Sequence, residues 1–245
     1  MSYSAPHTRQ SNQCLPTEPM SNTALVAEGG GQRGIFKHAV DLDWYFNQVD
    51  QAENKLNIGC GEERLTKRKL LFSATKADDR KATFFEPTRD NWLTVLKASS
   101  ALPILYKKGV EIDNSYYVDG GLSAPIPVEE AYQRGAKRIV VIRTVPKGVA
   151  VQSPWAHKLK SLLCNANRCP KVLDLITHHE NAYQATLHFI EKPPKDVEIV
   201  QIYPEKTLAS RLVGSSDNSL NHDYDLGFQA GLVFLARYEN NYAHK

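Results

Sequence analysis

The sequence of 245 residues lacks the features of a secreted, membrane-spanning or nucleic-acid-binding protein. Its four cysteines are too few for a disulfide framework, and its N-terminus has neither the charged nor the apolar part of a secretory signal. No apolar run reaches the roughly 20 residues that a bilayer-spanning helix needs. The 30 Lys and Arg residues against 27 Asp and Glu leave too little net charge for a nucleic-acid partner. We therefore expect a soluble, cytoplasmic protein.

Metal ligands at a recognisable spacing are also missing. Cys164 and Cys169 could form half of a zinc site, but no second cysteine pair or suitably spaced histidine accompanies them. The stretch His178-His179-Glu180 resembles part of an H-E-x-x-H motif without its spacing, which favours a cluster on the surface of a helix. We expect neither a metal nor another cofactor.

The first 22 residues show no hydrophobic periodicity. They are polar and contain three prolines, so residues 1–22 are predicted to be a disordered lead to one domain over residues 23–245. Within that domain, a helix over 127–134 is followed by a buried strand over 139–145, which is the rhythm of an α/β protein with a mostly parallel sheet. Other expected elements are a strand in "TALVA", a hairpin over 69–87, an amphipathic helix over 91–103, a hairpin that ends at Asp119, helices over 155–164, 171–191 and 225–239, and a strand over 197–204.

The stretch "EGGGQRGIF" (28–36) follows the first predicted strand and contains a glycine loop over Gly29–Gly34. Gly29, Gly31 and Gly34 fit the G-x-G-x-x-G pattern of a dinucleotide-binding loop. That pattern requires a full helix, a second strand and an acidic residue about 20 residues on, and no second apolar strand occurs before residue 69.

The same loop also suits an oxyanion hole. Glycines allow consecutive backbone N–H groups to converge on one oxygen, and such donors stabilise the oxyanion that develops during acyl transfer. The candidate residues are Gly29, Gly30, Gly31, Gln32, Arg33 and Gly34. Arg33 could add positive charge there or form an ordinary ion pair.

Asp119, in "YYVDGG", is the candidate base for such chemistry. An Asp at the end of a strand, followed by Gly120 and Gly121, lies where the chain turns sharply and a substrate can approach. A simple β-turn explains the same tripeptide.

The glycine loop, "ASSALP", "DGG" and "PIPV" occur in an order that resembles the patatin-like phospholipase family, in a bacterial branch, over about residues 23–240. The resemblance implies a three-layer α/β/α fold with a mostly parallel central sheet. It also implies hydrolysis of lipid acyl esters by a Ser–Asp dyad, with Asp119 as the dyad acid in the box Asp119-Gly120-Gly121. Oxyanion donors would fall within Gly29–Gly34. The implied partner is a lipid or acyl-ester substrate, with peripheral contact at the inner face of a membrane.

The nucleophile that the family carries in G-x-S-x-G is missing from this sequence. Ser123, in "GLSAP", has a proline where the second glycine belongs, and "GSSDN" (214–218) lacks that glycine as well. Ser99 and Ser100 lie at a helix end, where capping or packing explains them.

These gaps suggest an internal deletion near residues 36–39, which removes one strand–elbow–helix unit. The chain would then be an inactive or impaired member of the family. Two alternatives remain, a non-catalytic remnant that binds lipid or protein and, less favoured, a nucleotide-binding protein.

Overall fold

The computed structural model describes residues 22–28, 68–103, 106, 108–148, 170–210 and 215–242. The glycine loop over 29–34, the suggested junction near 36–39, the predicted helix over 155–164 and both Cys164 and Cys169 lie outside these ranges. So does the predicted disordered lead, apart from Asn22.

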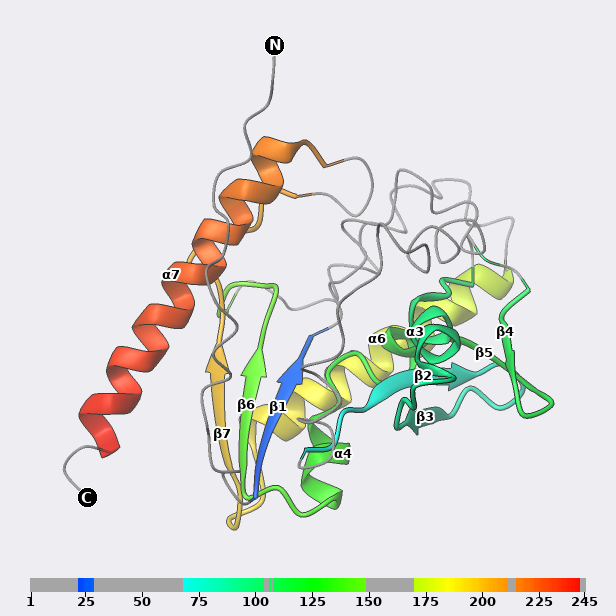
Figure 1. The fold of residues 1–245 in the computed structure, drawn as a ribbon, viewed down its shortest axis with the longest axis horizontal. Coiled ribbons are helices and arrows are strands. Elements are labelled where there is room, and N and C mark those ends of the chain that lie inside the picture. The colour runs from blue at the N-terminus through cyan, green and yellow to red at the C-terminus, as the bar shows by residue number, and fades with distance from the viewer. Residues whose placement is uncertain are drawn as a thin grey trace.

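Three parallel strands form the first sheet, in the order β1 (Thr23–Ala27), β6 (Arg138–Ile142) and β7 (Glu198–Ile202). They pair in register, so that Thr23 lies beside Arg138 and Arg138 beside Glu198 (Figure 1). The sequence of β6, "RIVVI", is rich in β-branched residues, and alternate side chains of this strand, Ile139 and Val141, are fully buried.

Four antiparallel strands form the second sheet, in the order β3-β2-β5-β4. They are β2 (Phe72–Lys76), β3 (Ala82–Phe85), β4 (Val110–Ile112) and β5 (Ser115–Asp119). Both predicted hairpins are confirmed. Their turns use residues in the left-handed region, Arg80 in the first and Asp113-Asn114 in the second, where Asp and Asn tolerate a positive φ.

The helices are α3 (Trp92–Ser100), the 3-10 helix η2 (Gly120–Leu122), α4 (Val128–Gln133), α6 (Pro170–Glu191) and α7 (Asp217–Tyr242). The predicted helices over 91–103, 127–134 and 171–191 are confirmed, and α7 is longer than the predicted 225–239. Within the described residues, no helix is both long and apolar enough to cross a membrane.

Each sheet has its own hydrophobic core. Helices α4 and α6 cover one face of the parallel sheet, and α3 packs on the antiparallel sheet. The residues of the first core are Val26, Ile126, Val128, Ala136, Ile139, Val141, Tyr183, Ile190 and Val197. Burying such a side chain contributes about 1.5–3 kcal/mol. The long helix α6 runs from one sheet toward the other, and it contacts both α4 and η2 (Figure 1).

The parallel sheet is less enclosed than most sheets of its kind. On the face away from α4 and α6, Leu25 is 70% exposed and Ile142 is 40% exposed. Parallel sheets are normally buried on both faces. Among the described strands, β1 pairs with β6 alone, so the other edge of β1 has no strand beside it in this part of the chain. The prediction of an α/β fold is confirmed, with the strands divided between a parallel and an antiparallel sheet.

Candidate functional site

Asp119 ends β5 and is held firmly by its neighbours. It is only 6% exposed. Its N–H donates to the carbonyl of Ala101 at 2.9 Å, and its own carbonyl accepts from Thr75 Oγ1 at 2.9 Å. The carboxylate Oδ1 accepts from the N–H of Gly121 at 2.7 Å, which fixes the carboxylate at the start of η2.

The two glycines after Asp119 lie in close packing, and the contact is tightest at Gly120, which faces backbone atoms. A Cβ on Gly120 would lie 2.1 Å from the carbonyl oxygen of Ser73, in the neighbouring strand β2. A Cβ on Gly121 would lie 2.9 Å from Asp119 Oδ1, the oxygen that its own N–H binds. The D-G-G sequence therefore lets the chain turn against β2 while it directs a backbone donor at the carboxylate.

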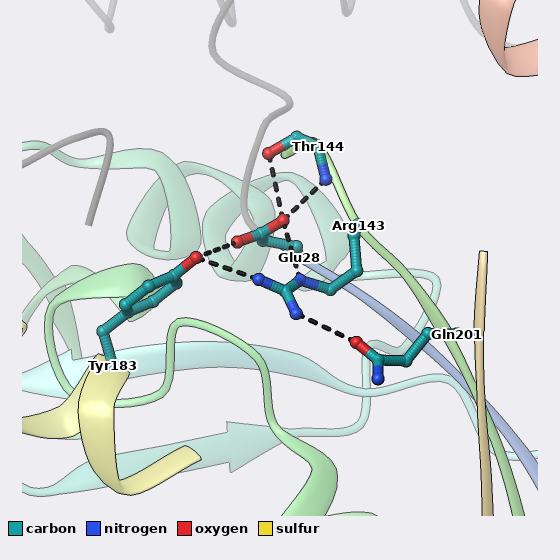
Figure 2. A network of polar contacts seen from close by, with 5 residues as sticks. All are labelled: Glu28, Arg143, Thr144, Tyr183 and Gln201. Carbon is teal, nitrogen blue, oxygen red and sulfur yellow. Dashed lines mark hydrogen bonds and ion pairs between the residues drawn. The ribbon is translucent and has the colours of Figure 1, made fainter. Parts of the chain in front are cut away.

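Glu28, the last described residue before the glycine loop, is the centre of a buried polar network (Figure 2). It follows β1 directly, and its N–H donates to the carbonyl of Ile142 at 2.8 Å. Its Oε2 accepts from the N–H of Thr144 at 2.6 Å, from Thr144 Oγ1 at 3.1 Å and from Arg143 Nε at 3.2 Å. Its Oε1 accepts from the hydroxyl of Tyr183 at 3.0 Å. Four donors thus satisfy this carboxylate.

Arg143 is also fully engaged in that network. Besides its bond to Glu28, Nη1 donates to Gln201 Oε1 and Nη2 to the hydroxyl of Tyr183, both at 3.0 Å (Figure 2). The Arg143 and Glu28 side chains are 10% and 5% exposed. Burial, followed by the nearby Glu28 charge, raises the pKa of Tyr183 well above its ordinary value, so this phenol remains a neutral donor.

The Glu28 network marks the carboxyl edge of the parallel sheet. Residues from the ends of β1, β6 and β7 meet there, and in open α/β sheets ligands bind at the carboxyl ends of the strands. Among the described residues, the charges of Glu28 and Arg143 are satisfied by each other and by neutral partners, so the network has a structural role at the ends of these strands.

Helix α6 contacts the aspartate turn directly. His179 Nδ1 donates to the carbonyl of Gly121 at 2.6 Å, and the imidazole is only 5% exposed. Burial lowers the pKa of His179, which keeps the ring neutral near pH 7. The prediction that His178-His179-Glu180 is a cluster on a helix surface is therefore wrong for His179, because α6 presents this residue to η2.

Ser123 and His178 form a pair that resembles a nucleophile and its base, with Oγ and Nε2 at 2.9 Å. However, Ser123 Oγ also donates its one proton to the carbonyl of Arg80 at 2.7 Å. A carbonyl can only accept, so the His178 Nε2–H must donate to Ser123 and cannot take its proton. The pair therefore ties α6 to the β2–β3 turn, and the same turn is bound by Arg80 Nη2 to Asp174 at 2.6 Å. Ser123 remains a poor substitute for the missing nucleophile.

Ser100 has a simple structural role. Ser100 Oγ donates to the carbonyl of Leu96 within α3, the packing role expected of it. In the part of the chain that the structure describes, no group of three or more His, Cys, Asp or Glu side chains is arranged to hold a metal.

The sequence did not indicate the residues that brace the site from a distance. Glu28, Arg143 and Tyr183 are far apart in the chain, and only the placement of charged residues directly after the apolar strands β1 and β6 hinted at their role. The structure brings Asp119, Gly120 and Gly121 together as one turn. The predicted oxyanion residues Gly29–Gly34 lie outside the described residues.

Comparison with known proteins finds two family models that match separate segments of the chain. A family model described as patatin-like phospholipase matches residues 46–132, and one described as a domain of unknown function, DUF6363, matches residues 169–243. An uncharacterized protein of Escherichia coli strain K12, YjjU, is 38% identical over 205 residues, which cover 80% of this chain and 55% of the relative. The chain thus spans about half the length of that relative. The patatin-like phospholipase match over residues 46–132 includes the Asp119 turn and the motifs "ASSALP", "DGG" and "PIPV", in agreement with the resemblance predicted for that segment, whereas the glycine loop lies outside the match.

Proposed function

We propose that this chain carries the aspartate part of a lipid acyl hydrolase site, in which Asp119 is the base of the Ser–Asp dyad. The observation that supports this most directly is the Asp119 turn, where a buried carboxylate at a strand end is oriented by the Gly121 N–H at 2.7 Å. The match of this segment to patatin-like phospholipases gives the substrate class, lipid acyl esters.

The proposed reaction is attack of a serine hydroxyl on the ester carbonyl. Asp119 would accept the serine proton, and N–H groups of Gly29–Gly34 would stabilise the oxyanion. An aspartate needs a fixed position for this role, because proton transfer requires hydrogen-bond contact with the nucleophile. The bonds to Ala101, Thr75 and Gly121 supply that position.

We further propose that an internal deletion near residues 36–39 has removed the nucleophile. No G-x-S-x-G occurs in the sequence. The unpartnered edge of β1 among the described strands, together with the exposed Leu25 on its open face, supports the loss of a strand and its covering helix. Loss of the serine typically leaves only about 10³–10⁴-fold acceleration over water, from the oxyanion site and binding.

Activity-based labelling tests the loss of the nucleophile. The purified chain should give no stoichiometric adduct with a fluorophosphonate and little hydrolysis of p-nitrophenyl butyrate or a lysophospholipid. A stoichiometric serine adduct would show that a nucleophile remains and would overturn this part of the proposal.

A graft tests the role of Asp119. Insertion of the G-x-S-x-G segment of a longer patatin-like relative between Phe36 and Ala39 should restore ester hydrolysis and fluorophosphonate labelling. In the grafted chain, Asp119→Asn should abolish turnover, whereas Asp113→Asn, in the exposed β4–β5 turn, should leave it unchanged. Equal turnover with and without the Asp119 carboxylate would remove it from the mechanism.

Helix α7 favours a second candidate function, peripheral lipid binding without catalysis. Its exposed large apolar side chains are Tyr224, Phe228, Leu232, Val233 and Leu235, several of them spaced along one stripe. Exposed apolar stripes of this kind can insert into a membrane interface.

Flotation with anionic phospholipid vesicles tests this candidate. Phe228→Asp combined with Leu232→Asp should lower vesicle binding at least about tenfold, since each side chain contributes about 1.5–3 kcal/mol when buried. Gln229→Asp, on the same helix, is the control for added charge. Unchanged flotation of the double variant would exclude α7 as the lipid-binding element.

A further inference from the structure

The helix that begins the C-terminal segment contacts both halves of the proposed site. From α6, His179 donates to the carbonyl of Gly121 at 2.6 Å, and Tyr183 donates to Glu28 Oε1 at 3.0 Å. Gly121 belongs to the aspartate turn, and Glu28 immediately precedes the glycine loop. One helix therefore reaches two segments that are about 90 residues apart in the chain.

The two residues that make these contacts, His179 and Tyr183, are neighbours on α6. His179 and Tyr183 are four residues apart, so they lie on the same face of α6 in adjacent turns. Their rings stack with centroids 6.2 Å apart and an interplanar angle of 24°. Both side chains are buried, at 5% and 2% exposure. The two hydrogen bonds therefore start from neighbouring side chains on one buried face of α6.

The bond from His179 acts on Asp119 through Gly121. The carbonyl of Gly121 accepts from His179, while the N–H of the same glycine donates to Asp119 Oδ1 at 2.7 Å. Because glycine has broad conformational freedom, an anchor on its carbonyl restricts the direction in which its N–H points. His179 thus helps to orient the Asp119 carboxylate indirectly, through the two hydrogen bonds of Gly121.

The far end of the same turn is attached to α6 as well. His178 Nε2 donates to Ser123 Oγ at 2.9 Å, and Ser123 donates in turn to the carbonyl of Arg80. The short helix η2 is therefore held by two successive residues of α6, one at Gly121 and one at Ser123.

We propose that α6 aligns two parts of the site, with His179 as the positioning residue for the Asp119 carboxylate and Tyr183 as the positioning residue for Glu28 at the end of β1. This inference rests on the proposed role of Asp119, and it gives a function to the segment that matches DUF6363. The essential feature of His179 is its Nδ1–H donor, and the essential feature of Tyr183 is its hydroxyl.

Two substitutions of His179 separate the donor from the ring. His179→Asn retains an N–H close to the position of Nδ1 but loses the ring that stacks on Tyr183. His179→Phe retains the ring and loses the donor. A positioning role predicts that H179N resembles the wild type and H179F does not, whereas a packing role predicts the reverse.

The measurement is amide NMR and hydrogen exchange of the full chain, without any ester substrate. In the wild type, the Gly121 amide proton should shift as Asp119 titrates. In H179F this shift should disappear, and exchange of the Gly121 amide should become about tenfold faster, as expected for one lost hydrogen bond. H179N should keep both signals. If H179F retains the Asp119-dependent shift, or H179N loses it, the proposal is wrong.

Tyr183→Phe tests the other contact independently. It should speed exchange of the Thr144 amide, which donates to Glu28 Oε2, and leave the Gly121 amide protected. Equal effects of Y183F on both amides would show general loosening and would contradict two separate positioning contacts. His188→Ala, at an exposed position of α6, should change neither amide.

A folding defect need not obscure the result. If H179F does not fold, His179→Leu removes the donor with a smaller apolar side chain and carries the same expectation. None of these measurements depends on catalysis. The amide signals could therefore contradict the role of His179 while Asp119 is still required for turnover in the grafted chain, or they could support it while Asp119 is not required. The two proposals therefore stand or fall separately.

Discussion

The antiparallel sheet around Asp119 and the parallel sheet around Glu28 differ in how completely the protein encloses them. Asp119 ends β5, which has a partner strand on each side and α3 packed nearby. Glu28 follows β1, which among the described strands has a partner on one side, and the exposed Leu25 lies on its open face. The segment around Asp119 is thus enclosed by strands and a helix, whereas the end of β1 is held by the polar network of Glu28.

The largest expected effect comes from breaking that polar network. Arg143→Met should destabilise the protein by about 3–5 kcal/mol, because it leaves the buried Glu28 carboxylate without its cation. Arg138→Met, at the start of the same strand β6, is the matched control. It removes a half-exposed pair with Glu198 and should cost at most about 1 kcal/mol. Chemical denaturation measures the free energy of unfolding of both variants. Similar losses would mean that the buried Glu28–Arg143 pair contributes no more to stability than the half-exposed pair.

In the antiparallel sheet, the stability of the protein should be most sensitive to substitution of Gly120. Gly120→Ala places a Cβ 2.1 Å from the backbone of Ser73, and overpacking of this kind typically costs about 1–3 kcal/mol or more. Gly231→Ala, in α7, meets no atom within 4 Å and should instead stabilise the protein by about 0.5–1 kcal/mol. Thermal and denaturant unfolding should therefore show opposite signs for the two variants. A neutral Gly120→Ala would contradict the close approach of β2 to the turn.

The smallest expected effect is a pH dependence from His179. Burial lowers its pKa in the folded protein, so between that value and the unfolded pKa of about 6.5 the unfolded chain binds more protons. Stability should therefore fall as the pH drops below about 6.5, with a slope of at most about 1.4 kcal/mol per pH unit for one proton. His179→Asn should remove this component in denaturation curves at pH 5–8. An unchanged slope would assign the pH dependence to other groups.

Local patterns in the sequence predicted most elements because each depends on neighbouring residues. The hairpins, α3, α4 and α6 were predicted from alternation, apolar periodicity and turn residues over short stretches. The turn at Asp119 was predicted from the tripeptide D-G-G alone. Likewise, the family resemblance drew on motifs that are each a few residues long.

The bracing residues could not be predicted in this way, because their roles arise from contacts across the fold. Glu28 and Tyr183 are 155 residues apart, and His179 reaches Gly121 across 58 residues. The histidine pair His178-His179 is visible in the sequence, but no local pattern distinguishes which of the two side chains is buried. Only the packing of α6 against both η2 and the parallel sheet decides that.

The position of α6 also bears on how such proteins are inherited. The two family models match separate segments of this chain, one ending at residue 132 and the other beginning at residue 169. Yet Tyr183 and Ile190 of the second segment share one core with Ile126 and Val128 of the first. A recombination event between the segments would expose that core on both sides of the cut. Selection should therefore transmit the two segments together, as a single evolutionary module that sequence families describe in two parts.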